Sequence, residues 1–306
     1  MPVPRPPAVQ HYQLFGLRVA SEIVLPEVLV ADFDADPDVV IRRTQIDAPE
    51  SSPGLALVDS DLVLTIPEVA RYRVRAGREI LVDIEPGTPD KNVRLYLLGS
   101  AMGAALHQRG LLPLHANAVE IEGRAVAFVG ASGAGKSTLA AWFQDRGHRV
   151  LSDDVCVVHG IGERRPLIYP AVRRLRLCRD ALVASGRSIT DFEPSYSGDP
   201  EFDKFDVPLR ESAAAPSELS DVVLLEFGER NALERIEGIA AAEILFANTY
   251  RGGMVDQLGS AGLHWQAVTR LLPTIRTWRW IRKRSIEDIG GEMQSLIGAL
   301  RLSSVD

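Results

Sequence analysis

Hydrophobic and polar positions follow one another in short runs along the first quarter of the chain, a pattern typical of β-strands. Glycine or Pro-Gly turns separate four such runs, at residues 39–42, 62–66, 72–74 and 80–84. The pattern predicts a small β-rich N-terminal domain over residues 11–89. Residues 1–10, rich in proline, are predicted to form an extended or disordered arm ahead of it.

Beyond residue 89 the spacing of apolar residues changes to that of a helix, which covers residues 91–108 and stops at Gly110. Further strands are predicted at residues 114–121, 124–129, 149–151, 155–158 and 221–227. Helices are predicted at residues 138–146 and 285–300, the second with Ser285 and Asp288 as its capping signature. This alternation predicts an α/β fold with a central sheet over residues 90–306.

Two segments fit more than one interpretation. Residues 184–218 hold Ser, Gly, Pro and Asp with few apolar runs, which favours a mobile lid over an insertion without a role. Residues 276–284 interleave aromatic and basic side chains, as peptide-binding or nucleic-acid-binding grooves do. Their alternation is also typical of a strand with one solvated face, and we favour the strand.

A glycine-rich loop joins the predicted strand 124–129 to the predicted helix 138–146 and fits G-x-x-x-x-G-K-[ST]. Its residues are Gly130, Ala131, Ser132, Gly133, Ala134, Gly135, Lys136, Ser137 and Thr138. In such a loop, backbone N–H groups and the positive end of the helix dipole face phosphate oxygens. Lys136 is expected to reach the β- and γ-phosphates, and the Ser137 hydroxyl to bind Mg²⁺. The sequence therefore predicts a nucleotide site for ATP and Mg²⁺.

Composition narrows the class of protein further. The 306 residues are 46% hydrophobic and 25% charged, as in ordinary globular proteins, and the formal net charge of −7 argues against a nucleic-acid partner. No run reaches the roughly 18 apolar residues that a membrane span needs, and the N-terminus lacks a signal peptide's apolar core. Two cysteines, Cys156 and Cys178, form neither a disulfide framework nor a metal site. We expect a soluble cytoplasmic protein.

A P-loop enzyme needs acidic residues to hold Mg²⁺ and to orient or deprotonate the nucleophile, and two such residues follow the short predicted strand 149–151. Asp153 and Asp154 would lie at its carboxyl end, where open α/β sheets bind their ligands. Two adjacent carboxylates repel each other, so a nearby cation is expected. Glu226, near the end of the predicted strand 221–227, is a competing metal acid. His115 lies just before the P-loop strand.

These residues together resemble the catalytic domain of bacterial HPr kinase/phosphorylases. The shared order is Leu114-His115-Ala116, the P-loop, Arg146-Gly147-His148-Arg149 and Asp153-Asp154. His115 lies 22 residues before Ser137, and Asp153 lies 16 after it. The resemblance covers roughly residues 110–180 and extends more weakly to the C-terminus. It implies that Asp153 is the catalytic base on a serine hydroxyl, that His115 assists, and that Ser137 and Asp154 hold the metal.

The chain departs from this family at three places. Thr138 stands where the family has Glu after the P-loop serine, and residues 171–175 replace a signature tied to the reverse, phosphorylase reaction. The N-terminal region is also unlike the family's usual N-domain. These departures argue against phosphorolysis and against HPr as the acceptor. The residues from Leu98 to His115 resemble instead the divergent HPr-kinase-like serine kinases, some of which accompany lasso-peptide biosynthesis.

The sequence thus predicts a kinase in which Asp153, His115 and Lys136 are catalytic and the acceptor is a serine of a peptide or small protein. Two alternatives stay open: a kinase of a small-molecule hydroxyl, and an ATP-binding regulatory module with little transfer activity. Neither a nucleic acid nor a membrane is expected as a partner. The sequence leaves both the monomer and a homo-oligomer open.

Overall fold

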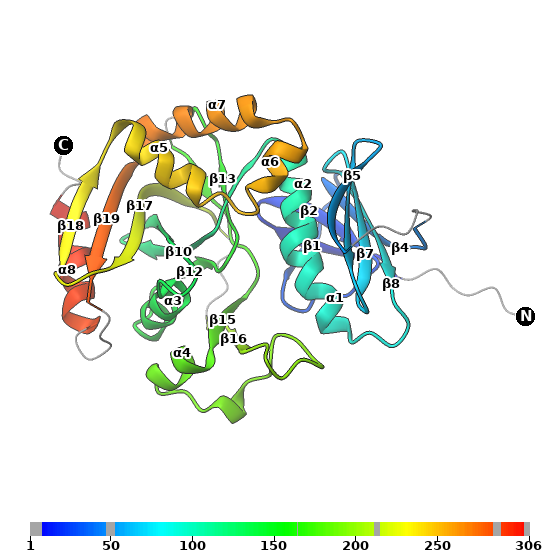
Figure 1. The fold of residues 1–306 in the computed structure, drawn as a ribbon, viewed down its shortest axis with the longest axis horizontal. Helices are drawn as coiled ribbons and strands as arrows, with labels where there is room; N and C mark the ends of the chain where they lie inside the picture. Colours follow the sequence, from blue (N-terminus) through cyan, green and yellow to red (C-terminus); the bar gives the residue numbers. More distant parts are fainter. Residues whose placement is uncertain (1–7, 47–52, 164, 211–214, 284–288, 303–306) are drawn as a thin grey trace, which may run out of the picture.

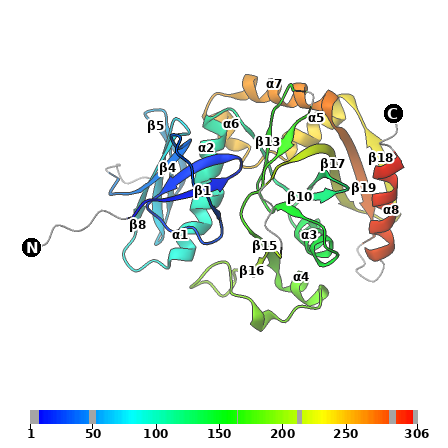
Figure 2. The ribbon, with the colours of Figure 1, turned by 180° about the vertical axis from the view of Figure 1, so that it is seen from behind.

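The computed structural model describes residues 8–46, 53–163, 165–210, 215–283 and 289–302, which form two sheets with a long helix between them (Figures 1 and 2). The N-terminal sheet has eight strands in the order β3-β1-β2-β4-β8-β7-β6-β5. They are β1 Gln10–Leu14, β2 Leu17–Ser21, β3 Leu29–Val30, β4 Val39–Arg43, β5 Gly54–Val58, β6 Asp61–Ile66, β7 Ala70–Arg75 and β8 Glu79–Ile84. The four strands predicted in this region are confirmed.

Two-residue turns with both residues in the left-handed region set the register of several hairpins. Phe15 and Gly16 join β1 to β2 with φ of 53° and 76°. Glu122 and Gly123 make the equivalent turn, with φ of 52° and 78°, between β10 Ala116–Ile121 and β11 Arg124–Val129 of the second sheet. Their backbone twist matches that of the flanking strands, so the antiparallel pairs continue without a register shift at the turn.

The helix between the sheets runs without a break from residue 90 to residue 108, as α1 Asp90–Tyr96, the π-helical turn η1 Leu97–Ala101 and α2 Met102–Gln108. The predicted helix at 91–108 is therefore confirmed. It packs on the N-terminal sheet and shares a core with it, and the Tyr72 hydroxyl donates to the carbonyl of Val93 at 2.8 Å. The helix belongs to both halves of the fold, and the division of the chain at residue 90 stays a prediction.

The second sheet has nine strands, with β11, β17 and β19 running parallel at its centre. The strands are β9 Leu112–Leu114, β10 Ala116–Ile121, β11 Arg124–Val129, β12 Val150–Ser152, β13 Cys156–His159, β14 Leu167–Ile168, β17 Ser217–Phe227, β18 Ala232–Ile236 and β19 Arg276–Arg282. Helices α3 Lys136–Asp145 and α8 Ile289–Leu302 cover one face, and α5 Gly238–Ala247 and α7 Ala261–Leu271 cover the other. The predicted α/β organisation is confirmed at this level.

The remaining elements are short. They are α4 Arg179–Ala184, η2 Ile189–Asp191, α6 Gly253–Gln257, η3 Leu272–Thr274 and a two-stranded hairpin of β15 Arg174–Cys178 with β16 Lys204–Pro208. Within the described ranges no helix is both long and apolar enough to cross a membrane.

Two expectations change. The segment predicted to be a lid, residues 184–218, contains the strand β16, which pairs with β15 because Phe205 and Val207 are buried against the central core. The arm of residues 1–10 ends earlier, since Gln10 already pairs with Ser21 in the sheet, and residues 1–7 lie outside the described residues. Residues 276–282 form the favoured strand, with Trp278, Trp280 and Arg282 buried on one face and Arg279 and Ile281 half-buried on the other. Ser285 and Asp288 also lie outside the described residues.

The β1–β2 turn docks against the second half of the fold, and a pair of glycine variants tests this contact. A Cβ on Gly16 would lie 2.8 Å from the Tyr169 ring, whereas a Cβ on Gly123 would meet open space. Both variants to Ala carry the backbone cost of a positive φ, so Gly16→Ala should lose about 1–3 kcal/mol more free energy of unfolding than Gly123→Ala. Denaturant unfolding measures the difference, and equal losses would show that the docking contact contributes nothing.

Candidate active site

The P-loop runs from β11 into α3, as the motif predicts. Gly130, Gly133 and Gly135 have φ of 143°, 81° and 88°, a region that other residues rarely adopt. A Cβ on Gly130 would lie 2.8 Å from the carbonyl oxygen of Leu225, so the loop passes close to the adjacent strand β17. Helix α3 begins at Lys136, two residues before the predicted start, and its N-terminal N–H groups face the loop.

The side chain of Lys136 folds back over this loop. Its Nζ donates to the carbonyl oxygens of Gly130 at 2.6 Å and Ala131 at 3.2 Å, and only 7% of the residue is exposed. Burial lowers the pKa of Lys136, and the two nearby aspartates partly restore it. The ammonium group therefore lies within the loop, the position from which it can exchange carbonyl oxygens for phosphate oxygens.

Two groups hold the loop from outside. The amide N–H of Gly130 donates to the Asn248 side-chain oxygen at 2.8 Å, and the backbone N–H of His115 donates to the carbonyl of Asn248 at 2.7 Å. Arg282 donates to the carbonyl of Ala134 at 2.8 Å, and a Cβ on Gly135 would lie 2.3 Å from its guanidinium. Asn248 and Arg282 were not predicted from the sequence, because only tertiary contacts bring α5 and β19 to the loop.

Asp153 lies against the P-loop serine. The Ser137 hydroxyl donates to Oδ1 of Asp153 at 3.0 Å, and the backbone N–H of Arg176 donates to Oδ2 at 2.6 Å. Burial raises the pKa of the Asp153 carboxyl, and the negative charge of Asp154 raises it further. Ser137, which was predicted to hold the metal together with Asp154, contacts Asp153 instead, and the metal role of Asp154 stays a prediction.

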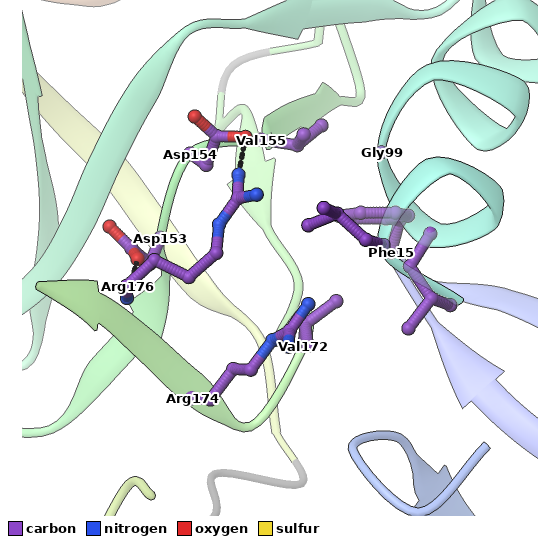
Figure 3. Close-up of a pocket in the computed structure, with 10 residues that line it drawn as sticks. Phe15, Gly99, Asp153, Asp154, Val155, Val172, Arg174 and Arg176 are labelled. Atoms are coloured by element: carbon purple, nitrogen blue, oxygen red, sulfur yellow. Dashed lines mark hydrogen bonds and ion pairs between the residues drawn. The ribbon is translucent and has the colours of Figure 1, made fainter. Parts of the chain in front are cut away.

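Asp154 has a different environment, shown in Figure 3. Its carboxylate forms an ion pair with Arg176, and its Oδ1 lies 3.4 Å from Nδ1 of His115. Although burial alone would raise the pKa of Asp154, the Arg176 guanidinium and then His115 hold it below its usual value. Burial lowers the pKa of His115, which favours its neutral form. A cation was expected near the two acids because they repel each other, and Arg176 is a cation at that place. The sequence did not indicate which residue would supply this charge.

A cavity of about 240 Å³ opens in front of the P-loop. Lys136, Ser137, His115 and Asp154 line it together with Asn117, Arg176 and Lys204. Lys204 comes from β16, so the segment that was predicted to be a lid supplies one wall. Behind the acid pair, Phe15 and Gly99 close a much smaller pocket of about 20 Å³ (Figure 3).

The competing acid, Glu226, is not part of this cavity. Its carboxylate lies 3.5 Å from the guanidinium of Arg279. The described residues hold no cluster of three or more His, Cys, Asp or Glu side chains suited to a metal. One hydroxyl, Ser137, and one neighbouring carboxylate suit Mg²⁺, which usually binds through one or two carboxylates and the phosphates of its substrate.

Comparison with known proteins supports the resemblance seen in the sequence. No protein-family model matches the chain. Over 125 residues the chain is 30% identical to the HPr kinase/phosphorylase of Prosthecochloris aestuarii, and this match covers 41% of the chain and 30% of that relative's length. Among solved structures, the HPr(Ser) kinase/phosphatase from Coxiella burnetii matches with a TM-score of 0.35 and 13% identity, over 62% of this chain and 91% of that one. The chain is therefore HPr kinase-like in sequence.

The ion pair of Asp154 with Arg176 yields a test of the site's electrostatics. Arg176→Gln leaves a buried carboxylate unpaired and should lower the free energy of unfolding by about 3 kcal/mol at neutral pH. Arg179→Gln, which breaks the half-exposed pair with Asp203, should cost less than about 1 kcal/mol.

The pH dependence of the same variant has a definite sign. Because the folded pKa of Asp154 is lowered, its pairing stabilises the fold above the unfolded pKa near 4 and is lost as the pH falls through the folded value. As the pH falls below about 4, the free energy of unfolding should therefore decrease less in Arg176→Gln than in the parent. Parallel stability curves for the two proteins would contradict the assigned partnership.

Proposed function

We propose that this chain is an ATP-dependent kinase that phosphorylates a serine hydroxyl on a peptide or small protein. The observation that carries the proposal is the contact between Ser137 and Asp153 beside a P-loop lysine, next to a cavity that also holds Asp154 and His115. P-loop enzymes that transfer phosphoryl groups need these parts: a loop and lysine for the phosphates, a hydroxyl for Mg²⁺ and a carboxylate for the nucleophile.

In this reaction the serine oxygen forms a bond to the γ-phosphorus, the bond from that phosphorus to the β–γ bridging oxygen breaks, and ADP leaves. Mg²⁺, when bound, would neutralise part of the negative charge on the β- and γ-phosphates. Lys136 holds the same phosphates, and the hydroxyl proton of the acceptor passes to a carboxylate of the acid pair. Burial lowers the pKa of His115 and so favours its uncharged form, and this side chain orients Asp154 through their contact.

Asp153 and Asp154 divide the two acidic roles, and we propose Asp153 as the base and Asp154 as the metal acid. The raised pKa of Asp153 suits proton uptake, and the lowered pKa of Asp154 keeps it ionised for a cation. One observation favours the reverse order: Asp153 contacts the metal-binding hydroxyl of Ser137, while Asp154 lines the cavity where an acceptor would enter.

Variants of the two acids distinguish these two assignments of the base and the metal acid. Replacing the base by Asn should lower kcat by about 10²–10⁴ while ATP affinity is kept. It should also flatten the acid limb of the pH profile, because the carboxylate that takes up the proton is gone. Replacing the metal acid should instead raise the Mg²⁺ concentration needed for half-maximal activity. Asp153→Asn is expected to give the first result and Asp154→Asn the second.

Lys136→Ala serves as a reference for nucleotide binding and should weaken both ATP affinity and turnover, because the lysine charge acts in ground and transition states alike. If the results for the two acid variants are exchanged, the roles are exchanged. If both variants keep parental kinetics, the acid pair is not the catalytic centre.

For the acceptor we propose a peptide or small protein, with a lasso-peptide precursor as the more specific choice. Two features support an acceptor side built by the β15–β16 hairpin. Lys204 lines the cavity together with residues of the P-loop, and its side chain has no ion pair among the described residues. A kinase of a small-molecule hydroxyl would use the same cavity, and a regulatory module would turn over ATP without labelling an acceptor. Transfer of ³²P from ATP to candidate peptides distinguishes the three.

Lys204→Met tests the acceptor side of the cavity. Since Lys204 lies in the wall formed by β16, its loss should raise the acceptor KM or lower kcat about tenfold with little change in the KM for ATP. Lys91→Met is the matched control, because Lys91 pairs with Glu193 outside the cavity. Equal kinetics for the Lys204 variant and the control would remove β16 from the acceptor site.

A further inference from the structure

Asn117 occupies an unusual place in the central sheet. It lies on β10, two residues after His115, and its neighbours on the same face, Val119 and Ile121, belong to the core under α3. The residues that alternate with them, Ala116 and Ala118, face the opposite core. Asn117 therefore points toward the side of the sheet on which the P-loop helix packs, and only 1% of the residue is exposed.

Within the described part of the chain, neither polar atom of this side chain has a hydrogen-bond partner. Both Nδ2 and Oδ1 of Asn117 are buried without a hydrogen bond to any described residue. Asn92, another buried amide, shows the ordinary arrangement: its Nδ2 donates to the carbonyl of Ser197 and its Oδ1 accepts the N–H of Ser197, both at 2.8 Å. An unpaired buried amide destabilises a protein, so its presence calls for a partner that is not part of the chain.

The position of Asn117 indicates what that partner is. The residue lines the same cavity as Lys136 and Ser137, which define the phosphate end of the proposed nucleotide site, and as His115 and Asp154. An amide offers donors to phosphate oxygens and an acceptor to a hydroxyl. The cavity thus brings one donor and one acceptor, both free of protein partners, to the place where a phosphoryl group and a hydroxyl would meet.

We propose that Asn117 is a substrate-contacting residue, whose Nδ2 donates to an oxygen of the transferred γ-phosphoryl group and whose Oδ1 accepts from the acceptor hydroxyl. The inference rests on the proposed function and adds a residue to that site. The contact forms only when substrates are bound, so the free protein carries an unpaired amide that the complex satisfies.

Stability of the free protein gives the first test. Asn117→Leu keeps the approximate volume and removes both unpaired atoms, so the melting temperature should rise by about 2–4 °C. Asn92→Leu is the matched control, since the same substitution there removes two good hydrogen bonds and should lower the melting temperature. A structural role for Asn117 predicts a decrease for both variants.

Nucleotide affinity gives the second test, measured by calorimetry with ATP and ADP. Asn117→Leu should weaken ATP binding about tenfold or more and leave ADP binding within about twofold, because ADP lacks the γ-phosphoryl group. The Asn92→Leu variant should bind both nucleotides as the parent does. An unchanged ATP affinity, or an equal loss for ATP and ADP, would overturn the inference.

The measurements distinguish a failure of the proposed function from a failure of the role assigned to Asn117. If the parent binds no ATP, the proposed function is wrong, and so is the ligand assigned to Asn117. If the parent binds ATP, Lys136→Ala weakens that binding and Asn117→Leu does not, the proposed function stands and the role of Asn117 is wrong.

Discussion

Asp153 and Asp154 are neighbours in the chain and both are buried, so the protein must offset their repulsion internally. Arg176 does so for both, because its backbone N–H donates to Asp153 and its guanidinium pairs with Asp154. This requires β15 to pass directly beside the acid pair. Its antiparallel partner β16 then brings Lys204 to the cavity. The compensation of two buried charges thus determines where one wall of the candidate site lies.

The same hairpin connects the site to the N-terminal half of the fold. Arg174 pairs with Asp206 across the two strands, and the Ser195 hydroxyl donates to the same carboxylate at 2.5 Å. The loop that contains Ser195 continues to Ser197, whose backbone makes two hydrogen bonds with the Asn92 side chain of α1. Helix α1 in turn packs on the N-terminal sheet. The N-terminal sheet therefore supports the wall of the cavity that holds Lys204, although it contains none of the predicted catalytic residues.

The P-loop side is supported by the other half of the chain. Asn248, at the end of α5, accepts hydrogen bonds from the backbone N–H groups of both His115 and Gly130, the first residue of the loop. Arg282, at the end of β19, donates to the carbonyl of Ala134. A peptide unit is planar and trans, so the N–H of Gly135 points away from that carbonyl. Arg282 therefore fixes the peptide unit that joins Ala134 to Gly135, and with it the direction of the Gly135 N–H.

The sequence determined those features that depend on local pattern. The period of apolar residues located four of the eight strands of the N-terminal sheet and the helix at residues 91–108. The motif from Gly130 to Thr138 located the phosphate loop, because glycine spacing and strand–helix context are local properties. Tertiary structure alone decided which acid contacts Ser137, that Arg176 neutralises the pair, and that Asn117 faces the cavity unpaired. These features depend on contacts between strands and loops that are distant in the sequence. Their burial and charge compensation therefore cannot be predicted from a short stretch of neighbouring residues.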